Sequence, residues 1–112
     1  MTGMTNFLAG DLVLAHVPFS SGTQAKLRAA LIVLDTGDAD VLIVRVTSQK
    51  PQTPYDVVLT EWKQSGLLFP SVARLHKMVT IETSLINRRI GQIQPTDRVA
   101  VAAAFRQMFG NW

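Results

Sequence analysis

The chain of 112 residues contains 47% hydrophobic and 17% charged residues, a balance that fits one compact domain and excludes an intrinsically disordered protein. It contains no cysteine, which excludes a disulfide framework and thiolate chemistry, and no apolar run near the roughly 20 residues that a membrane span requires. The formal net charge of +3 is too small by itself to indicate that the protein binds nucleic acid.

The first half of the chain predicts three strands. Apolar residues alternate along 11–19, which indicates a strand with one buried face. A Ser/Gly/Thr loop over 20–24 separates it from a continuous apolar run over 29–34, which is typical of a central strand. A turn over 35–38 leads to a β-branched strand over 41–46, and these last two strands are close enough to pair as a hairpin.

The middle of the chain predicts a loop, a short strand and a helical turn. Two prolines in 50–54 remove donors that a sheet interior needs, so this segment is a loop. Residues 55–59 form a short strand. Residues 60–66 form one helical turn, with Thr60 as its N-cap and Gly66 as its end.

The last third predicts two further strands and a helix. Residues 71–81 are extended and alternating, and 90–93 form a short last strand. A helix begins at Pro95, presents an apolar stripe at helical spacing and ends at Gly110. The predicted fold is mainly β with a C-terminal helix (α+β), a small and strongly bent antiparallel sheet or barrel.

Residues 1–10 lack the basic start and the long apolar centre of a secretory signal. We therefore expect a single domain over residues 1–112 that works in the cytoplasm and makes no contact with a membrane.

Two polar clusters flank the most apolar part of the chain. Guanidinium, ammonium and hydroxyl groups at the ends of neighbouring strands can bind a phosphodiester. Taken alone, each cluster is more typical of an ordinary polar strand end than of a binding site. The residues are Lys26 and Arg28 before the apolar part, and Arg45, Thr47, Ser48 and Gln49 at its end.

A third polar set lies in the predicted strand over 71–81. Arg74 and His76 are two residues apart, so their side chains project from the same face. An imidazole can take up or release a proton near neutral pH, and a neighbouring guanidinium can hold a phosphate and offset its charge. The opposite face of the strand is predicted to carry the apolar residues Ala73, Leu75, Val79 and Ile81.

Metal and cofactor chemistry have no support in the sequence. His16 and His76 are far apart, and neither lies in a cluster with the spacing of metal ligands. A nucleophile elbow, a phosphate-binding Gly-rich loop and a dinucleotide fingerprint are all missing from the sequence. We expect no metal and no cofactor.

In order and spacing, the polar sets and their flanking residues resemble the MazF/PemK family of toxins from toxin–antitoxin pairs. No single motif is specific, but the ordered series covers nearly the whole chain. The matching stretches are 10–13, 26–33, 46–48, 66–67, 71–74, 80–81 and 90–93.

The resemblance implies a small SH3-like antiparallel barrel of the MazF/PemK/CcdB type that forms a homodimer. It also implies an endoribonuclease that cuts single-stranded RNA at short sequences without a metal and is silenced by a cognate antitoxin. The family's functional positions correspond to Arg28, Thr47 and Ser48, and in the PemK-like branch to Arg74. The chain departs from the family at Ala29, where a proline is usual, and at His76, where some members carry a carboxylate.

The hypothesis is a nuclease in which the 2′-hydroxyl of the substrate attacks phosphorus. His76 would transfer the proton, and Arg28 and Arg74 would stabilise the added negative charge. Thr47 and Ser48 would position the phosphate or the adjoining nucleotide. Bases would be read by the loops over 20–25 and 50–54, because RNA sequence is read on unstacked bases. The expected RNA contacts are Lys26, Ser48, Gln49, Lys50, Ser20 and Thr23.

Two other functions stay open. A CcdB-like poison of the topoisomerase gyrase would use residues at the extreme C-terminus, where this chain ends in Phe109 and Trp112. A non-catalytic barrel that binds nucleic acid or protein is the other.

The antitoxin is expected to be an acidic, partly disordered segment. The outward face of the first strand, with Leu12 and Leu14, suggests a second layer or a subunit contact.

Overall fold

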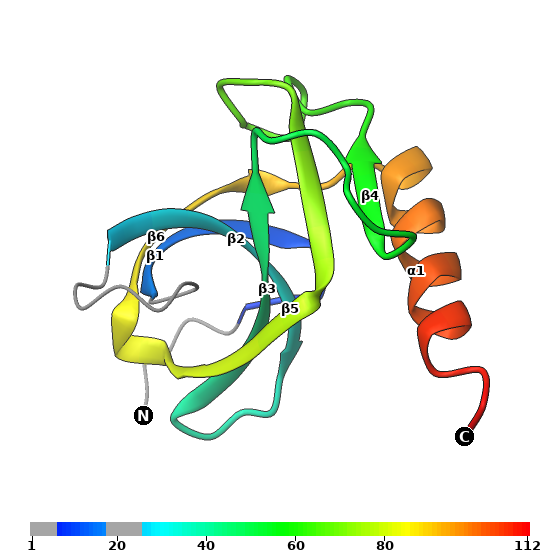
Figure 1. Ribbon diagram of the computed structural model, residues 1–112. Coiled ribbons are helices and arrows are strands. Elements are labelled where there is room, and N and C mark those ends of the chain that lie inside the picture. Colours follow the sequence, from blue (N-terminus) through cyan, green and yellow to red (C-terminus); the bar gives the residue numbers. More distant parts are fainter. Residues whose placement is uncertain (1–6, 18–25) are drawn as a thin grey trace.

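The computed structural model describes residues 7–17 and 26–112 (Figure 1). These residues form a curved sheet with one α-helix beside it. The elements in chain order are β1 (Asp11–Val17), β2 (Lys26–Asp35), β3 (Asp40–Thr47), β4 (Asp56–Leu59), β5 (Ser71–Glu82), the 3-10 helix η1 (Thr83–Leu85), β6 (Ile86–Gln92) and α1 (Pro95–Met108).

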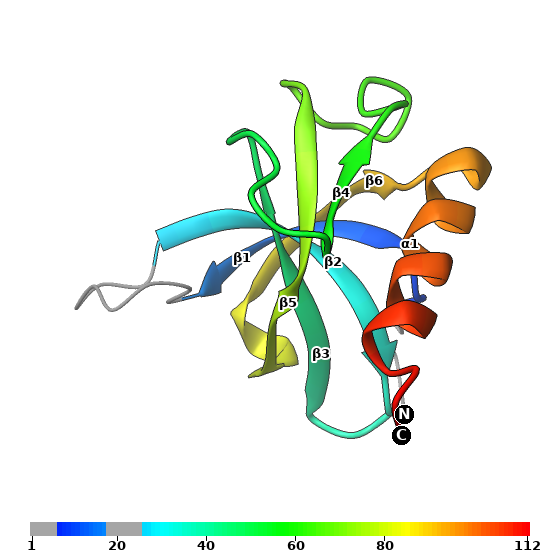
Figure 2. The same cartoon turned by 45° about the vertical axis from the view of Figure 1, so that its right-hand side comes forward.

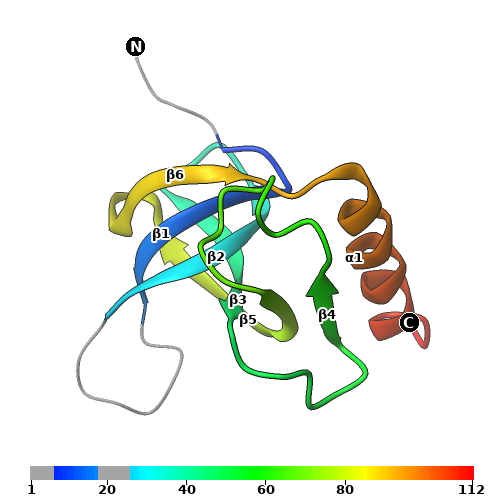
Figure 3. The same ribbon diagram turned by 90° about the horizontal axis from the view of Figure 1, so that it is seen from above.

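The strands form one antiparallel sheet in the order β4-β5-β3-β2-β1-β6. The sheet bends strongly, so that β1, β2 and β6 curve around the interior (Figure 1). Within the described residues the edge strands β4 and β6 do not pair, and α1 packs against β4 instead (Figures 2 and 3). The prediction of a mainly β fold with a C-terminal helix is confirmed, and the barrel is an open, curved sheet rather than a closed cylinder.

Both faces of the sheet are buried along much of its length. One apolar cluster fills the inside of the curve and includes Val13, Ala30 and Ile43. The other lies between the sheet and α1 and includes Leu12 of β1 and Val101 of α1. Because successive residues of a strand face opposite sides, β1 contributes to both clusters. The second layer suggested for the outward face of the first strand is therefore supplied in part by α1.

A bulge in β5 overturns one sequence prediction. Residues 75–77 have no register partner in β3, so the alternation of the strand is interrupted there. Ala73 and Leu75 pack in the cluster beside α1, whereas Val79 and Ile81 pack in the opposite cluster. The prediction that all four share one face was wrong, because an apolar pattern does not reveal the three residues that the bulge inserts.

The predicted helical turn over 60–66 is present as a turn, but its N-terminus is held differently. Asp97, in the first turn of α1, is buried and accepts hydrogen bonds from the backbone N–H of Thr60 and of Glu61, each at 2.9 Å. The hydroxyl of Thr60 also donates to Asp97 at 2.7 Å, so Thr60 is not the cap that was predicted. The turn is therefore tied to α1 by a tertiary contact.

The ends of two other elements differ from the predictions. The last strand begins at Ile86 rather than at residue 90, because its polar first half pairs with β1. The helix α1 begins at Pro95 as predicted and ends at Met108, which leaves Phe109 half exposed. In the described part of the chain, no helix combines the length and the hydropathy needed to cross a membrane.

Candidate phosphodiester-binding site

Three arginines line up on one face of the sheet, across β2, β3 and β5. Arg45 of β3 lies directly opposite Arg74 of β5. On the side of β3 that faces β2, Arg45 pairs with Ala30. Arg28 precedes Ala30 by two residues. Side chains two residues apart in a strand share a face, so Arg28 belongs to the same row. The row continues the face that carries the inner apolar cluster, and we call it the arginine row.

Positive charge in the arginine row is only partly neutralised. Arg74 pairs with Asp56, and its side chain is 11% exposed. Among the described residues, no carboxylate forms an ion pair with Arg28 or Arg45, which are half-buried. Burial, together with the charges of Arg28 and Arg74, lowers the pKa of Arg45. An anion that bound here would relieve this unfavourable charge density.

Asp56 connects the arginine row to the loop before β4. Its side chain is fully buried, and its Oδ2 accepts the backbone N–H of Gln52 at 2.7 Å and of Thr53 at 3.0 Å. Its Oδ1 lies 3.2 Å from Nε of Arg74 and 3.8 Å from Nδ1 of His76. Burial opposes ionisation, but these hydrogen bonds from Gln52, Thr53 and Arg74 outweigh it and lower the pKa of Asp56.

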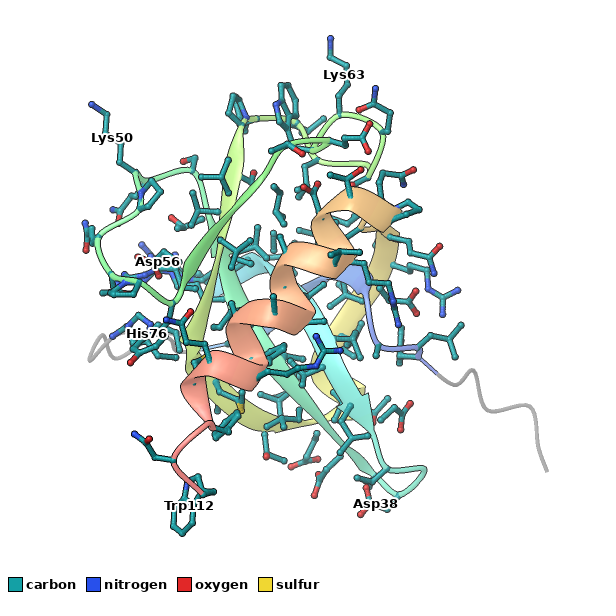
Figure 4. All side chains as sticks on the ribbon, turned by 90° about the vertical axis from the view of Figure 1, so that its right-hand side faces the viewer. Asp38, Lys50, Asp56, Lys63, His76 and Trp112 are labelled. Carbon is teal, nitrogen blue, oxygen red and sulfur yellow. The ribbon has the colours of Figure 1, made fainter. Side chains whose placement is uncertain are left out.

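The structure brings His76 to the end of the arginine row. Arg74 and His76 both reach Asp56, so they share a side of β5, and Figure 4 shows His76 beside Asp56. The His76 side chain is 31% exposed, and the ring of Tyr55 lies 6.3 Å away, centroid to centroid. An imidazole with access to solvent beside a guanidinium is placed to exchange a proton with a bound phosphodiester.

Thr47 and Ser48 lie in different surroundings. Thr47 ends β3 two residues after Arg45 and so continues its face, and its Oγ1 accepts the N–H of Gln49 at 3.3 Å. Ser48 lines a groove of about 290 Å³ whose walls include Leu14 and Leu67. The structure therefore brings Thr47, but not Ser48, to the arginine row.

Three of the other predicted RNA contacts, Lys26, Gln49 and Lys50, are exposed. Lys26 begins β2, while Gln49 and Lys50 line a second groove of about 460 Å³ together with Trp62. Ser20 and Thr23 lie outside the described residues. Within the ranges that the structure describes, no three His or carboxylate side chains gather as metal ligands would.

Sequence reasoning placed Arg45 in the second polar cluster without giving it a role, and it missed Asp56 as part of the site. Arg45 interrupts an otherwise apolar strand, and a charge at such a position is a signal that the sequence does contain. Asp56 carries no such signal, because its role arises only when β4 pairs with β5 and sets it opposite Arg74.

Solved structures of several toxins share this fold. The Mycobacterium tuberculosis toxin MazF-mt6 has a TM-score of 0.74 at 21% identity, covering 89% of this chain and 96% of that one. An endoribonuclease from Mycobacterial species has a TM-score of 0.76 at 18% identity, covering 97% and 96%. An endoribonuclease in complex with its cognate antitoxin, also from Mycobacterial species, has a TM-score of 0.73 at 19% identity, covering 92% and 94%. No match was found among curated proteins.

The sequence itself identifies the family. Residues 8–109 match the profile of the PemK-like, MazF-like toxin of type II toxin–antitoxin system. The match spans nearly the whole chain, so this protein belongs to that family, and the resemblance found in its sequence is confirmed.

Replacing Arg45 by methionine is expected to raise the free energy of unfolding by about 1 kcal/mol, because the change removes a half-buried cation that lies between two others. Urea unfolding in a buffer without phosphate or sulfate measures the change. The matched control is Arg106→Met in the exposed last turn of α1, where no gain is expected. A loss of stability in Arg45→Met beyond that of the control would contradict the prediction.

Proposed function

We propose that this protein is the toxin of a toxin–antitoxin pair and acts in the cytoplasm as an endoribonuclease. It cleaves single-stranded RNA at short sequences without a metal ion. The observation that carries the proposal is the arginine row, only one member of which has a carboxylate partner in the described chain, with His76 at its end. Family membership supports the same activity.

The proposed reaction uses the 2′-hydroxyl of the substrate as its nucleophile. His76 accepts the proton of this hydroxyl while the oxygen bonds to the neighbouring phosphorus. The bond from phosphorus to the 5′-oxygen then breaks, and that oxygen takes a proton from water. The products are a 2′,3′-cyclic phosphate and a 5′-hydroxyl. Arg28 and Arg74 stabilise the added negative charge on the phosphorus centre, where fixed donors have their largest effect.

The remaining polar residues would bind the RNA around the cleaved bond. Thr47 is proposed to position the phosphate, since it continues the face of Arg45. Exposed Lys26, the first residue of β2, and exposed Lys50, in the loop after β3, would contact flanking phosphates. Ser48 and Gln49 would contact an adjoining nucleotide from the second groove, which both of them line.

Two protein partners are part of the proposal. The antitoxin would be an acidic, partly disordered segment that covers the arginine row, because its charge complements Arg28 and Arg45, which have no carboxylate partner within the described residues. The second partner is another copy of the chain. An apolar groove lined by Leu14 and bordered by exposed Leu68 and Phe69 supports a homodimer, which light scattering of the purified protein measures.

Incubation with long single-stranded RNA in EDTA tests the activity. We expect cleavage at short recurring sequences, with cyclic phosphate or 3′-phosphate ends and 5′-hydroxyl ends. An oligonucleotide with a single 2′-deoxy substitution at the cleaved nucleotide should resist cutting, because it lacks the nucleophile. Cutting of that oligonucleotide, or loss of activity on chelation, would overturn the mechanism.

A gyrase-poisoning toxin is the second candidate. The observation in its favour is that Trp112 is fully exposed and Phe109 half exposed beyond α1, where a partner protein could reach both. Deletion of Trp112 separates the two functions in a growth assay. The gyrase function predicts that toxicity is lost, and the endoribonuclease function predicts little change.

A further inference from the structure

We propose that Asp56 is a positioning residue for RNA cleavage, which holds Arg74 by Nε and so leaves both terminal nitrogens of its guanidinium free to bind a phosphate. The inference rests on the proposed endoribonuclease function and adds a residue that does not itself touch the substrate.

The contact between Asp56 and Arg74 uses one particular nitrogen. Oδ1 of Asp56 accepts a hydrogen bond from Nε of Arg74 at 3.2 Å. Within the described chain, no hydrogen bond to either terminal nitrogen of Arg74 is formed. Two parallel N–H donors are what bidentate binding of phosphate oxygens requires, and the terminal nitrogens supply such a pair. The carboxylate therefore orients the guanidinium without occupying its phosphate-binding edge.

Asp56 is itself held firmly enough to act as a support. Its Oδ2 accepts two backbone N–H groups, from Gln52 and Thr53, and its own N–H donates to the carbonyl of Thr53 at 3.1 Å. The same turn is joined to β5 by a hydrogen bond from Leu75 N–H to the Tyr55 carbonyl at 3.0 Å. A fully buried carboxylate with this many fixed donors has one orientation, which it imposes on Arg74.

The arginine row contains an internal contrast. Arg28 and Arg45 lie on the same face, yet neither forms an ion pair in the described residues. Within the arginine row, and among the residues that the structure describes, Arg74 alone has a guanidinium held by a carboxylate, and that carboxylate also lies beside His76. Nδ1 of His76 lies 3.8 Å from Oδ1 of Asp56, which is beyond hydrogen-bond distance. The proposed positioning role of Asp56 is therefore confined to Arg74.

The test variant is Asp56→Asn, which keeps the size of the side chain and removes its charge. We expect kcat for a short RNA to fall about 10- to 100-fold with a much smaller change in KM, as for other residues that orient a functional group. The matched control is Asp38→Asn. Asp38 also accepts a backbone N–H, but it lies in the turn between β2 and β3, far from Asp56 in Figure 4, and its replacement should leave kcat unchanged.

A double-mutant cycle separates positioning of Arg74 from a general structural role. In the Arg74→Ala background, the change of Asp56 to asparagine should cost no more than about 2-fold in kcat, because the residue that it orients is gone. A loss of the same size in both backgrounds would overturn the proposal.

Two further measurements do not depend on cleavage. The Nε–H of Arg74 should exchange slowly with water in the parent and at least tenfold faster in Asp56→Asn, as NMR detects. A non-cleavable 2′-deoxy oligonucleotide should bind slightly more weakly to the variant than to the parent, in line with the small change expected in KM. If the parent does not cut RNA, the proposed endoribonuclease function is wrong. The exchange rate of the Arg74 Nε–H and the affinity for the oligonucleotide still test whether Asp56 orients Arg74 for binding. Unchanged exchange and unchanged affinity would overturn it.

If Asp56→Asn does not fold at the assay temperature, Arg74→Lys is used as the test variant instead. Lysine keeps the charge beside Asp56 but lacks Nε–H and the fork of terminal nitrogens. We expect at least a tenfold loss of kcat and of oligonucleotide affinity. Activity equal to that of the parent would overturn the proposal.

Discussion

Replacing Arg28 by alanine is expected to lower the rate of RNA cleavage by about 10² to 10³-fold while leaving the fold intact. Arg28 lies in β2, paired with Ala15 of β1, so the backbone that carries it is held in the sheet by that pairing. Among the described residues no carboxylate pairs with it, so its charge is available to the phosphorus centre. Donors that are fixed before the reaction stabilise the developing charge without reorganisation, which is why the expected loss is large.

Single-turnover cleavage of a short RNA by the two proteins measures this effect, and circular dichroism checks that the variant is folded. Arg106→Ala removes the same charge from the exposed last turn of α1 and is expected to cut at the parent rate. The assignment of Arg28 would be wrong if Arg28→Ala cut RNA as fast as the parent does.

Replacing Gly66 by alanine is expected to lower the free energy of unfolding by about 3 kcal/mol or more, the sum of two costs. The first is backbone strain, because Gly66 has a φ of +97°, a backbone conformation that residues with a side chain rarely adopt. The second is steric, because an added Cβ would run into the carbonyl oxygen of Ile90 in β6. Across the same contact, a Cβ at Gly91 would run into the carbonyl of Ser65. The turn and β6 therefore approach each other backbone to backbone.

Gly37→Ala is the matched control for this prediction. Gly37 also has a positive φ, of +85°, but a Cβ there would meet nothing within 4 Å. Its expected cost is only the strain, about 1 to 2 kcal/mol. Urea unfolding of both variants gives the difference, which isolates the close approach of the turn to β6. Equal losses in the two variants would mean that the turn moves away from β6 at no cost.

Local features of this protein could be predicted from its sequence because they depend on neighbouring residues. The alternation along β1, the apolar run of β2 and the helical spacing of α1 report which faces are buried, and the structure has these elements where they were expected. The two-residue spacing of Arg74 and His76 likewise predicts a shared face, and both side chains reach Asp56. The bulge in β5 marks the limit of this reasoning, since alternation carries no sign of it.

By itself, the sequence determined the strands, the helix and the presence of cationic residues at strand ends. Only the tertiary structure decided that Arg45 stands between Arg28 and Arg74, that Asp56 orients one of the three, and that Ser48 turns to a different groove. The physical reason is register. A shift of one residue between paired strands moves every side chain to the opposite face, and the choice of register depends on the packing of both apolar clusters rather than on any local pattern.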